Sequence, residues 1–176
     1  AIISPDEKTK IRIDQLKNFG HVGETNVVAP GINGKMSEIN AAFGLLQLKH
    51  IDHALAKRKA IDTAYREKLK NVKGIECLNA SGETVANYSY FPIVVEGDYP
   101  ISRDDLNERL KAIGIHPRRY FYPLITEFPM YRGLPSANRD NLQVASAASK
   151  KILCLPIYPN LSLDIVEKIS TFIATQ

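Results

Sequence analysis

The 176-residue sequence contains no tryptophan and only two cysteines, and it has no continuous apolar run long enough to cross a lipid bilayer. No signal-peptide pattern is recognised, so we expect a cytoplasmic location and no membrane partner. The two cysteines, Cys77 and Cys154, lie far apart in apolar segments. We therefore expect reduced, buried thiols and no disulfide.

A large excess of one charge is also missing. The chain has 23 basic and 19 acidic residues, a net charge of +4, and the basic residues are spread along it. This distribution is typical of a solvated surface and does not indicate a nucleic-acid partner. With 44% hydrophobic residues, the composition is that of an ordinary globular protein with a real core.

Several common catalytic motifs are absent. There is no G-x-S-x-G nucleophile motif, and residues 31–35 (GINGK) have neither the spacing nor the preceding strand of a Walker A or dinucleotide-binding loop. His50 and His53 are three residues apart on a predicted helix, but no nearby cysteine or carboxylate cluster would complete a zinc site. We expect a solvated helix face there and no metal site.

The first residues predict a strand followed by a helix. Ile2 and Ile3 are expected to end a buried strand, and Ser4 is expected to cap the helix that follows. Gly20 is a plausible end for that helix. Residues 20–35, which are rich in glycine, asparagine and proline, are expected to form a loop.

A single long helix is predicted after this loop. Ser37 caps it, and no glycine or proline occurs between residues 44 and 74. Over 30 residues at ~1.5 Å each, it would be about 50 Å long and would bridge two domains. We place the domain boundary inside it, with residues 1–50 in one domain and 51–176 in the other. Its apolar stripe comprises Met36, Ile39, Phe43, Leu46, Ile51, Leu55, Ile61, Tyr65 and Leu69.

The rest of the sequence alternates between strand and helix patterns. Strands are predicted over residues 75–78, 90–95, 115–122 and 152–157, and helices over 103–113, 142–150 and from 163 onward. Ser102 and Ser162 are the expected caps of the first and last of these helices. The pattern predicts an α/β fold in which a small sandwich is covered by helices on one face.

Two segments are candidates for binding. In the loop before the long helix, Asn33 and Lys35 precede a helix start, where free N–H groups and the helix dipole favour an anion. The small residues Ala41, Ala42 and Gly44 would allow another helix or subunit to pack closely. A capped turn packed within one chain is the alternative.

The second candidate is the basic and aromatic segment 118–122 (RRYFY). On a strand these side chains would alternate between two faces, so they would not form a single nucleic-acid platform. Two interpretations remain open. The segment is either a strand edge whose arginines extend into solvent, or a contact for a phosphorylated or nucleotide-linked ligand.

Residues 31–48, GINGKMSEINAAFGLLQL, resemble the G-x-N-x-[RK]-M-S-E-x-x-A-A-x-G-L-x-Q-L segment of the DegT/DnrJ/EryC1/StrS sugar aminotransferases. This family consists of pyridoxal 5'-phosphate (PLP) enzymes of fold type I. Further matches follow in order over essentially the whole chain: residues 18–21, Arg58, Arg103 and Asp104, Leu110, residues 114–115, 122–124 and 152–159.

The resemblance implies a homodimer, formed through residues 31–48, whose active sites lie at the subunit interface. It implies that Asn33 binds the cofactor phosphate of the other subunit and that Lys35 lies beside the phosphate or the substrate. Lys35 stands where many members have arginine, and a lysine cannot grip an oxyanion with two parallel hydrogen bonds. His21, Tyr120 and Tyr122 resemble residues that border the sugar-nucleotide pocket.

The lysine that binds the cofactor in this family, and the aspartate that pairs with its pyridine nitrogen, lie upstream of the residues present here. By resemblance the chain is therefore the C-terminal part of a fold type I aminotransferase, with a long bridging helix and a small α+β domain. It carries no catalytic residue of its own and is expected to be inactive alone. The whole enzyme would transfer an amino group from glutamate to a nucleotide-linked 4-keto-6-deoxy sugar, in deoxyaminosugar (lipopolysaccharide or O-antigen) biosynthesis.

Two alternatives remain. Within the family, the enzyme could act on another keto sugar or a cyclitol, or could be a dehydratase. In a different class, the chain could be a non-catalytic basic α/β module that binds nucleotides or RNA, which predicts salt-sensitive binding.

Overall fold

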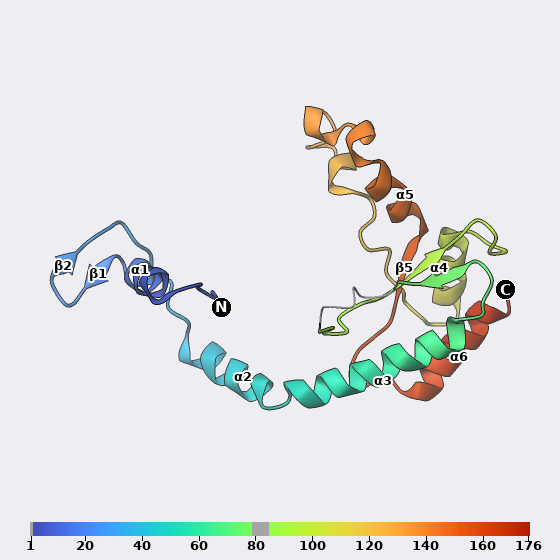
Figure 1. Cartoon of the computed structure of the whole chain (residues 1–176), viewed down its shortest axis with the longest axis horizontal. Coiled ribbons are helices and arrows are strands. Elements are labelled where there is room, and N and C mark those ends of the chain that lie inside the picture. Colours follow the sequence, from blue (N-terminus) through green and yellow to red (C-terminus); the bar gives the residue numbers. More distant parts are fainter. Residues whose placement is uncertain (1, 79–84) are drawn as a thin grey trace. The chain divides into compact units, whose positions relative to one another are not determined.

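A computed structural model describes residues 2–78 and 85–176 and divides the chain into two compact units, Ala1–His50 and Ile51–Gln176 (Figure 1). The first unit contains helix α1 (Glu7–Lys17), the short strands β1 (His21–Val22) and β2 (Asn26–Val27), and helix α2 (Glu38–Leu48). Within residues 2–78 and 85–176, no helix combines the length and apolar character needed to span a membrane.

The start of the first unit differs from the prediction. Ile2 and Ile3 form no strand and are 75% and 97% exposed. The helix begins later than expected, because Asp6 and not Ser4 caps α1: the Thr9 N–H donates to Asp6 Oδ1 over 2.7 Å. At its other end, Gly20 adopts a left-handed φ of +81° and donates its N–H to Gln15.

The single long helix was also predicted wrongly. Ser37 does cap a helix, but α2 ends at Leu48 and α3 (Ile51–Leu69) begins three residues later. The N–H groups of Lys49 and His50 bond to carbonyls three residues back, a tighter pattern that ends α2 without a glycine or proline.

The predicted apolar stripe therefore falls on two helices with different surroundings. In α3, the side chains of Ile61, Tyr65 and Leu69 are buried in the core. In α2, no residue is buried, and Ile39 and Phe43 are 82% and 62% exposed. The periodicity predicts which residues share a helix face, but it does not show whether the same chain covers that face.

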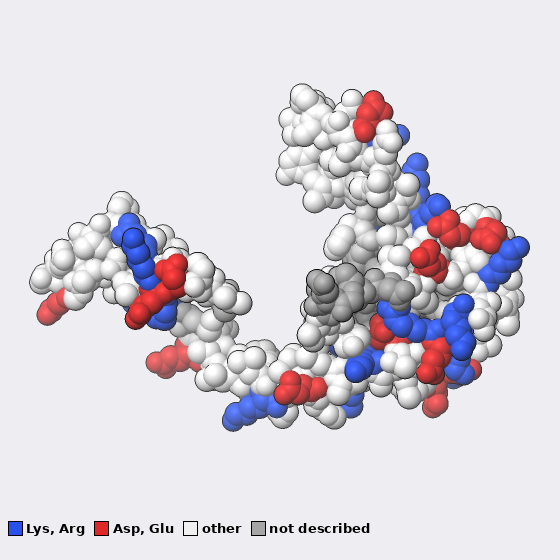
Figure 2. Space-filling view, in the orientation of Figure 1, with Lys and Arg blue, Asp and Glu red and all other residues white. Residues whose placement is uncertain are grey.

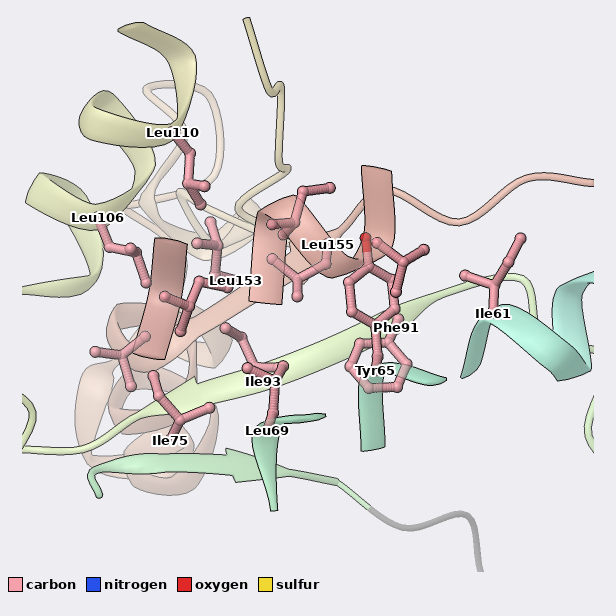
Figure 3. Packing of buried hydrophobic residues seen from close by; sticks show 14 of the residues in the cluster. Ile61, Tyr65, Leu69, Ile75, Phe91, Ile93, Leu106, Leu110, Leu153 and Leu155 are labelled. Carbon is pink, nitrogen blue, oxygen red and sulfur yellow. The ribbon is translucent and has the colours of Figure 1, made fainter. Parts of the chain in front are cut away.

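The second unit is built on a three-stranded antiparallel sheet in the order β3–β4–β5. Strand β3 is Ile75–Cys77, β4 is Phe91–Val95 and β5 is Ile152–Leu155. Phe91, Ile93 and Val95 alternate toward one face and are buried there. Figure 3 shows Phe91 and Ile93 packed with residues of α3 and of helix α4 (Arg103–Ala112). Helix α6 (Leu163–Ala174) lies beside α3, and its buried residues belong to the same core. Helices packed on a small sheet confirm the α/β architecture.

Serines cap two of these helices as predicted: Ser102 accepts from Asp105 N, and Ser162 accepts from Ile165 N. The predicted helix over 142–150 is α5 (Gln143–Lys151), and it follows three 3-10 turns, Ile125–Glu127, Pro135–Ala137 and Arg139–Leu142. Cys77 and Cys154 are both free thiols, as expected. Cys154 is buried, whereas Cys77 is only half-buried.

The strand predicted over residues 115–122 does not form. Only Arg118 pairs with the sheet, through one antiparallel bridge to Cys154. The chain then turns away through Tyr120 and Tyr122, and Phe121 is 68% exposed. The aromatic composition of this segment is typical of strands, but the segment extends from the sheet as a loop.

Candidate functional site

The loop that carries Asn33 is fixed to the C-terminal end of α1 by backbone hydrogen bonds. The Phe19 N–H donates to Ile32 O over 3.0 Å, and the Ile32 N–H donates to Leu16 O over 2.8 Å. One residue beyond Asn33, the Gly34 N–H donates to Lys17 O over 2.8 Å. Because the residues on both sides are held, the Asn33 backbone is positioned even though the residue is exposed.

Glycine is required for this close approach at Gly31. A Cβ atom there would lie 2.4 Å from the Gly20 nitrogen and 2.5 Å from the Leu16 carbonyl oxygen. These atoms belong to the backbone and cannot rotate away. The glycine-rich composition of the loop is therefore explained by its contact with the end of α1.

The predicted polar residues of the first unit gather around this contact. Lys35 Nζ donates to Asn18 Oδ1 over 3.2 Å and lies 5.5 Å from the Phe19 ring centre. Within the described residues, the Asn33 side chain makes no hydrogen bond. The His21 N–H donates to the Asn18 carbonyl, so His21 is connected to the same turn. An exposed amide donor and a cation are thus available to an oxyanion.

The other two predicted residues, Tyr120 and Tyr122, lie in the second unit. They line a pocket of about 400 Å³, together with Lys111, Arg118 and Arg119. Aromatic rings and three cations share this pocket, and such a surface suits a planar, anionic ligand. The Tyr90 and Tyr120 rings meet edge to face at 5.4 Å.

Beside this pocket, a carboxylate joins two arginines. Asp104 Oδ1 accepts from Arg103 Nε over 2.9 Å and from Arg119 Nη1 over 2.8 Å. Both guanidinium groups lie against the Tyr122 ring, at 4.9 and 5.5 Å from its centre. Burial raises the pKa of Asp104. The hydrogen bonds and charges of Arg119 and Arg103 lower this pKa by a larger amount, so it lies below its usual value.

The structure thus forms two groups of predicted residues: Asn33, Lys35 and His21 in the first unit, and Tyr120 and Tyr122 in the second. The sequence reasoning did not identify the linkage of Arg103, Asp104 and Arg119. Arg103 and Asp104 did match the family pattern. The contact between Asp104 and Arg119, which are 15 residues apart, leaves no local pattern in the sequence. Across residues 2–78 and 85–176, no group of three or more metal-ligating side chains is found.

An exposed apolar surface adjoins the Asn33 loop. We define the α2 face as Met36, Ile39, Phe43 and Leu46, which follow one another at three- and four-residue steps and are all at least 49% exposed. The visible side of α2 carries few charged side chains (Figure 2). A Cβ atom at Gly44 would meet nothing within 4 Å, so this glycine is not needed for packing within the described part of the chain. Apolar surface of this extent is typical of an interface.

Comparison with known sequences gives a match over nearly the whole chain. The sequence model of the DegT/DnrJ/EryC1/StrS aminotransferase family matches residues 1–174. A dTDP-4-amino-4,6-dideoxy-D-glucose transaminase of Escherichia coli is 58% identical over 170 residues, which are 97% of this chain and 46% of that protein. A protein of the same name from Shigella dysenteriae is 48% identical over 96% of this chain and 46% of its own length. The chain spans about half the length of the curated relatives it matches.

This chain also covers a little under half of the solved structures that it matches. DesI, crystallised in the presence of its TDP-sugar product, has a TM-score of 0.82 and 29% identity, over 98% of this chain and 43% of its own. The PLP form of Spr1654, a putative sugar aminotransferase from Streptococcus pneumoniae, has a TM-score of 0.81 and 25% identity, over 98% and 44% of the respective chains.

Proposed function

The chain belongs to the DegT/DnrJ/EryC1/StrS aminotransferase family, and from this membership we propose that it is the C-terminal part of an enzyme that aminates a nucleotide-linked keto sugar. The observation that carries the proposal is the 58% identity with a named dTDP-4-amino-4,6-dideoxy-D-glucose transaminase. The amino acceptor is then dTDP-4-keto-6-deoxy-D-glucose, and the amino group ends on carbon 4. Glutamate is the proposed amino donor.

The proposed cofactor is PLP, and the Asn33 loop fits its phosphate. The loop presents an exposed amide at Asn33 and a cation at Lys35, and backbone hydrogen bonds to the end of α1 hold it in place. The Asn33 side chain would donate to a phosphate oxygen, and the Lys35 ammonium would contribute charge. When bound, the cofactor supplies the electron sink that allows an amino group to move between donor and sugar.

The remaining predicted residues are assigned to the sugar nucleotide. Tyr120 and Tyr122 contribute ring faces and hydroxyl groups to a pocket that also contains three cations, which suits a base and a diphosphate. His21, which is half-buried near the Asn33 loop, borders the sugar. These side chains bind and orient the substrate, while the residues for proton transfer lie in the part of the enzyme upstream of this chain.

A homodimer is part of the proposal. The α2 face is exposed in the single chain, and it begins one residue after Lys35. Pairing of this face with a second copy would remove apolar surface from water and carry the Asn33 loop to the neighbouring subunit. Asn33 would then bind the phosphate of the other subunit's cofactor.

The role of Asn33 can be tested in the full-length enzyme. Asn33→Ala should weaken PLP retention roughly 10- to 150-fold, because one hydrogen bond to a charged phosphate is lost, typically worth ~1.5–3 kcal/mol. Retention is measured by cofactor absorbance after dialysis. Asn26→Ala, at an exposed asparagine in β2, is the matched control and should retain PLP normally. Unchanged PLP affinity and rate in Asn33→Ala would contradict the assignment.

The alternatives give different products or ligands. A panel of keto sugars and cyclitols, with product analysis, separates an aminotransferase for this sugar from a relative with another substrate and from a dehydratase. A non-catalytic nucleotide- or RNA-binding module would instead show salt-sensitive nucleic-acid binding and no cofactor absorbance.

A further inference from the structure

We infer that Asp104 is a positioning residue, which holds the aromatic segment Tyr120–Tyr122 at its pocket and thereby sets the affinity for the nucleotide sugar. The inference rests on the proposed function for the identity of the ligand. The attachment of the segment by Asp104 does not depend on the ligand, because all the residues involved lie in the second unit.

The Arg103 side chain is buried and held by hydrogen bonds to the backbone. This arginine is 4% exposed, and its Nη1 donates to the carbonyl oxygens of Ser149 and Ile152 over 2.9 and 3.0 Å. These two carbonyls belong to the junction of α5 and β5. The guanidinium is therefore held at the sheet, and its Nε presents a further donor to Asp104.

Asp104 links the fixed guanidinium of Arg103 to the aromatic segment. Its Oδ1 atom also accepts from Arg119, which immediately precedes Tyr120. Among the described residues, this is the only ion pair made by residues 115–124. The Tyr122 ring lies against both guanidinium groups, so the carboxylate fixes the two cations that the ring contacts.

Apart from the edge-to-face contact of the Tyr120 ring with Tyr90, the segment has little other support. Tyr120, Phe121 and Tyr122 are 37%, 68% and 44% exposed, and none of them belongs to a strand. Before them, Arg118 is bound to β5 by a two-way backbone bridge with Cys154. A loop with few buried contacts opens at low cost, so one ion pair has a large influence on its position.

The solvent exposure of Asp104 indicates that it positions the segment and adds little to global stability. The Asp104 side chain is 55% exposed, and ion pairs at such sites contribute little to global stability. Loss of its charge is therefore expected to release the segment locally without unfolding the unit. Substrate binding would weaken, and the chemical step would be unaffected, since the reacting groups lie elsewhere.

The chain offers a matched control for this test. Asp104 is the second residue of α4, after the cap Ser102, and Asp164 is the second residue of α6, after the cap Ser162. Asp164 makes no ion pair with any described residue. Asp104→Asn and Asp164→Asn therefore remove the same charge from equivalent helix positions, but only the first removes the charge that strengthens the hydrogen bond from Arg119.

The full-length enzyme carrying each variant is examined in two ways. Tryptic cleavage of the Arg119–Tyr120 bond is compared with cleavage at Arg139–Asp140, which lies outside the linkage. Steady-state kinetics are measured with dTDP-4-keto-6-deoxy-D-glucose. For Asp104→Asn we expect roughly two- to fivefold faster cleavage after Arg119 and a KM raised by a similar factor, with kcat unchanged. Asp164→Asn should change neither, and Asp104→Glu should recover part of both.

Unchanged cleavage after Arg119 in Asp104→Asn would overturn the positioning role. Faster cleavage with an unchanged KM, or a fall in kcat alone, would overturn the link to substrate affinity. Failure of the wild-type enzyme to aminate the sugar would refute the proposed function and with it the assignment of the ligand. The cleavage rates would still decide whether Asp104 holds the segment.

Discussion

Asn33 is constrained by the backbone contacts of its neighbours and not by its own side chain. Asn33 has an exposed side chain, while its neighbours are bonded to the end of α1. Gly31 makes this possible, because its Cα lies where a side chain would meet two backbone segments. A ligand-binding amide can in this way remain accessible and still be well positioned.

Gly31→Ala is predicted to destabilise the loop. The added methyl group would lie 2.4 Å from the Gly20 nitrogen, so the loop must move away from α1. The expected cost is about 1–3 kcal/mol, the range typical of overpacking. Hydrogen exchange of the Ile32 and Gly34 amides in the full-length protein measures this cost. Gly97→Ala is the control, since nothing lies within 4 Å of its new methyl group. Equal protection in both variants would contradict the prediction.

The charge state of Asp104 gives a second prediction. Its pKa is lowered from the ordinary value of 3.8, against the effect of burial, by Arg119 and Arg103. The pairing therefore contributes its full stability above pH 3.8, and this contribution is lost as the pH falls through the lower folded value. Titration of the Asp104 carboxyl carbon by NMR should give a midpoint below 3.8. In Arg119→Met the midpoint should rise, and an unchanged midpoint would exclude the ion pair in solution.

The part of the site that could be predicted from sequence is the part encoded in a local pattern. Asn33 and Lys35 lie within one continuous motif, and a glycine-rich turn before a helix indicates an anion site by itself. Asp104 and Arg119 meet only because α4 contacts β5 and Arg118 is bridged to β5 at Cys154. No periodicity or capping rule connects residues that are brought together by tertiary packing.

At the scale of elements, capping residues were better predictors than apolar composition. Ser37, Ser102 and Ser162 each begin a helix, because a cap satisfies local N–H groups wherever the helix packs. The strand prediction over 115–122 was wrong because strand formation needs a neighbour along its length, and only Arg118 has one. The break between α2 and α3 left no glycine or proline signal.

The α2 face gives the prediction that belongs to this scale. Phe43 is 62% exposed in the single chain, and we expect a second copy to cover it. Phe43→Glu should convert the full-length dimer to monomer, because burial of an unpaired charge at an interface costs ~2 kcal/mol or more. Light scattering after size-exclusion chromatography measures the mass.

Val144→Glu is the control for this change. Val144 is 84% exposed on α5, outside the α2 face, and the same substitution there should leave the dimer intact. A Phe43→Glu protein that stays dimeric would show that the α2 face is not the subunit interface.

In the whole molecule, each of the two units carries its own group of the proposed binding residues. The first unit presents Asn33 and Lys35, and the second presents the aromatic pocket. The chain covers 46% of the E. coli relative, so the groups that perform proton transfer are expected in the remainder of the enzyme. Under the proposed function, this chain binds and orients the substrate, and the cofactor supplies the chemistry.

The central claim is that the complete enzyme places an amino group on carbon 4 of a dTDP-linked sugar. The most direct test is incubation of the full-length protein with PLP, ¹⁵N-labelled glutamate and dTDP-4-keto-6-deoxy-D-glucose, followed by NMR of the purified sugar nucleotide. We expect ¹⁵N bonded to carbon 4 and one 2-oxoglutarate formed for each amino sugar. A sugar without ¹⁵N, or with the label on carbon 3, would contradict it.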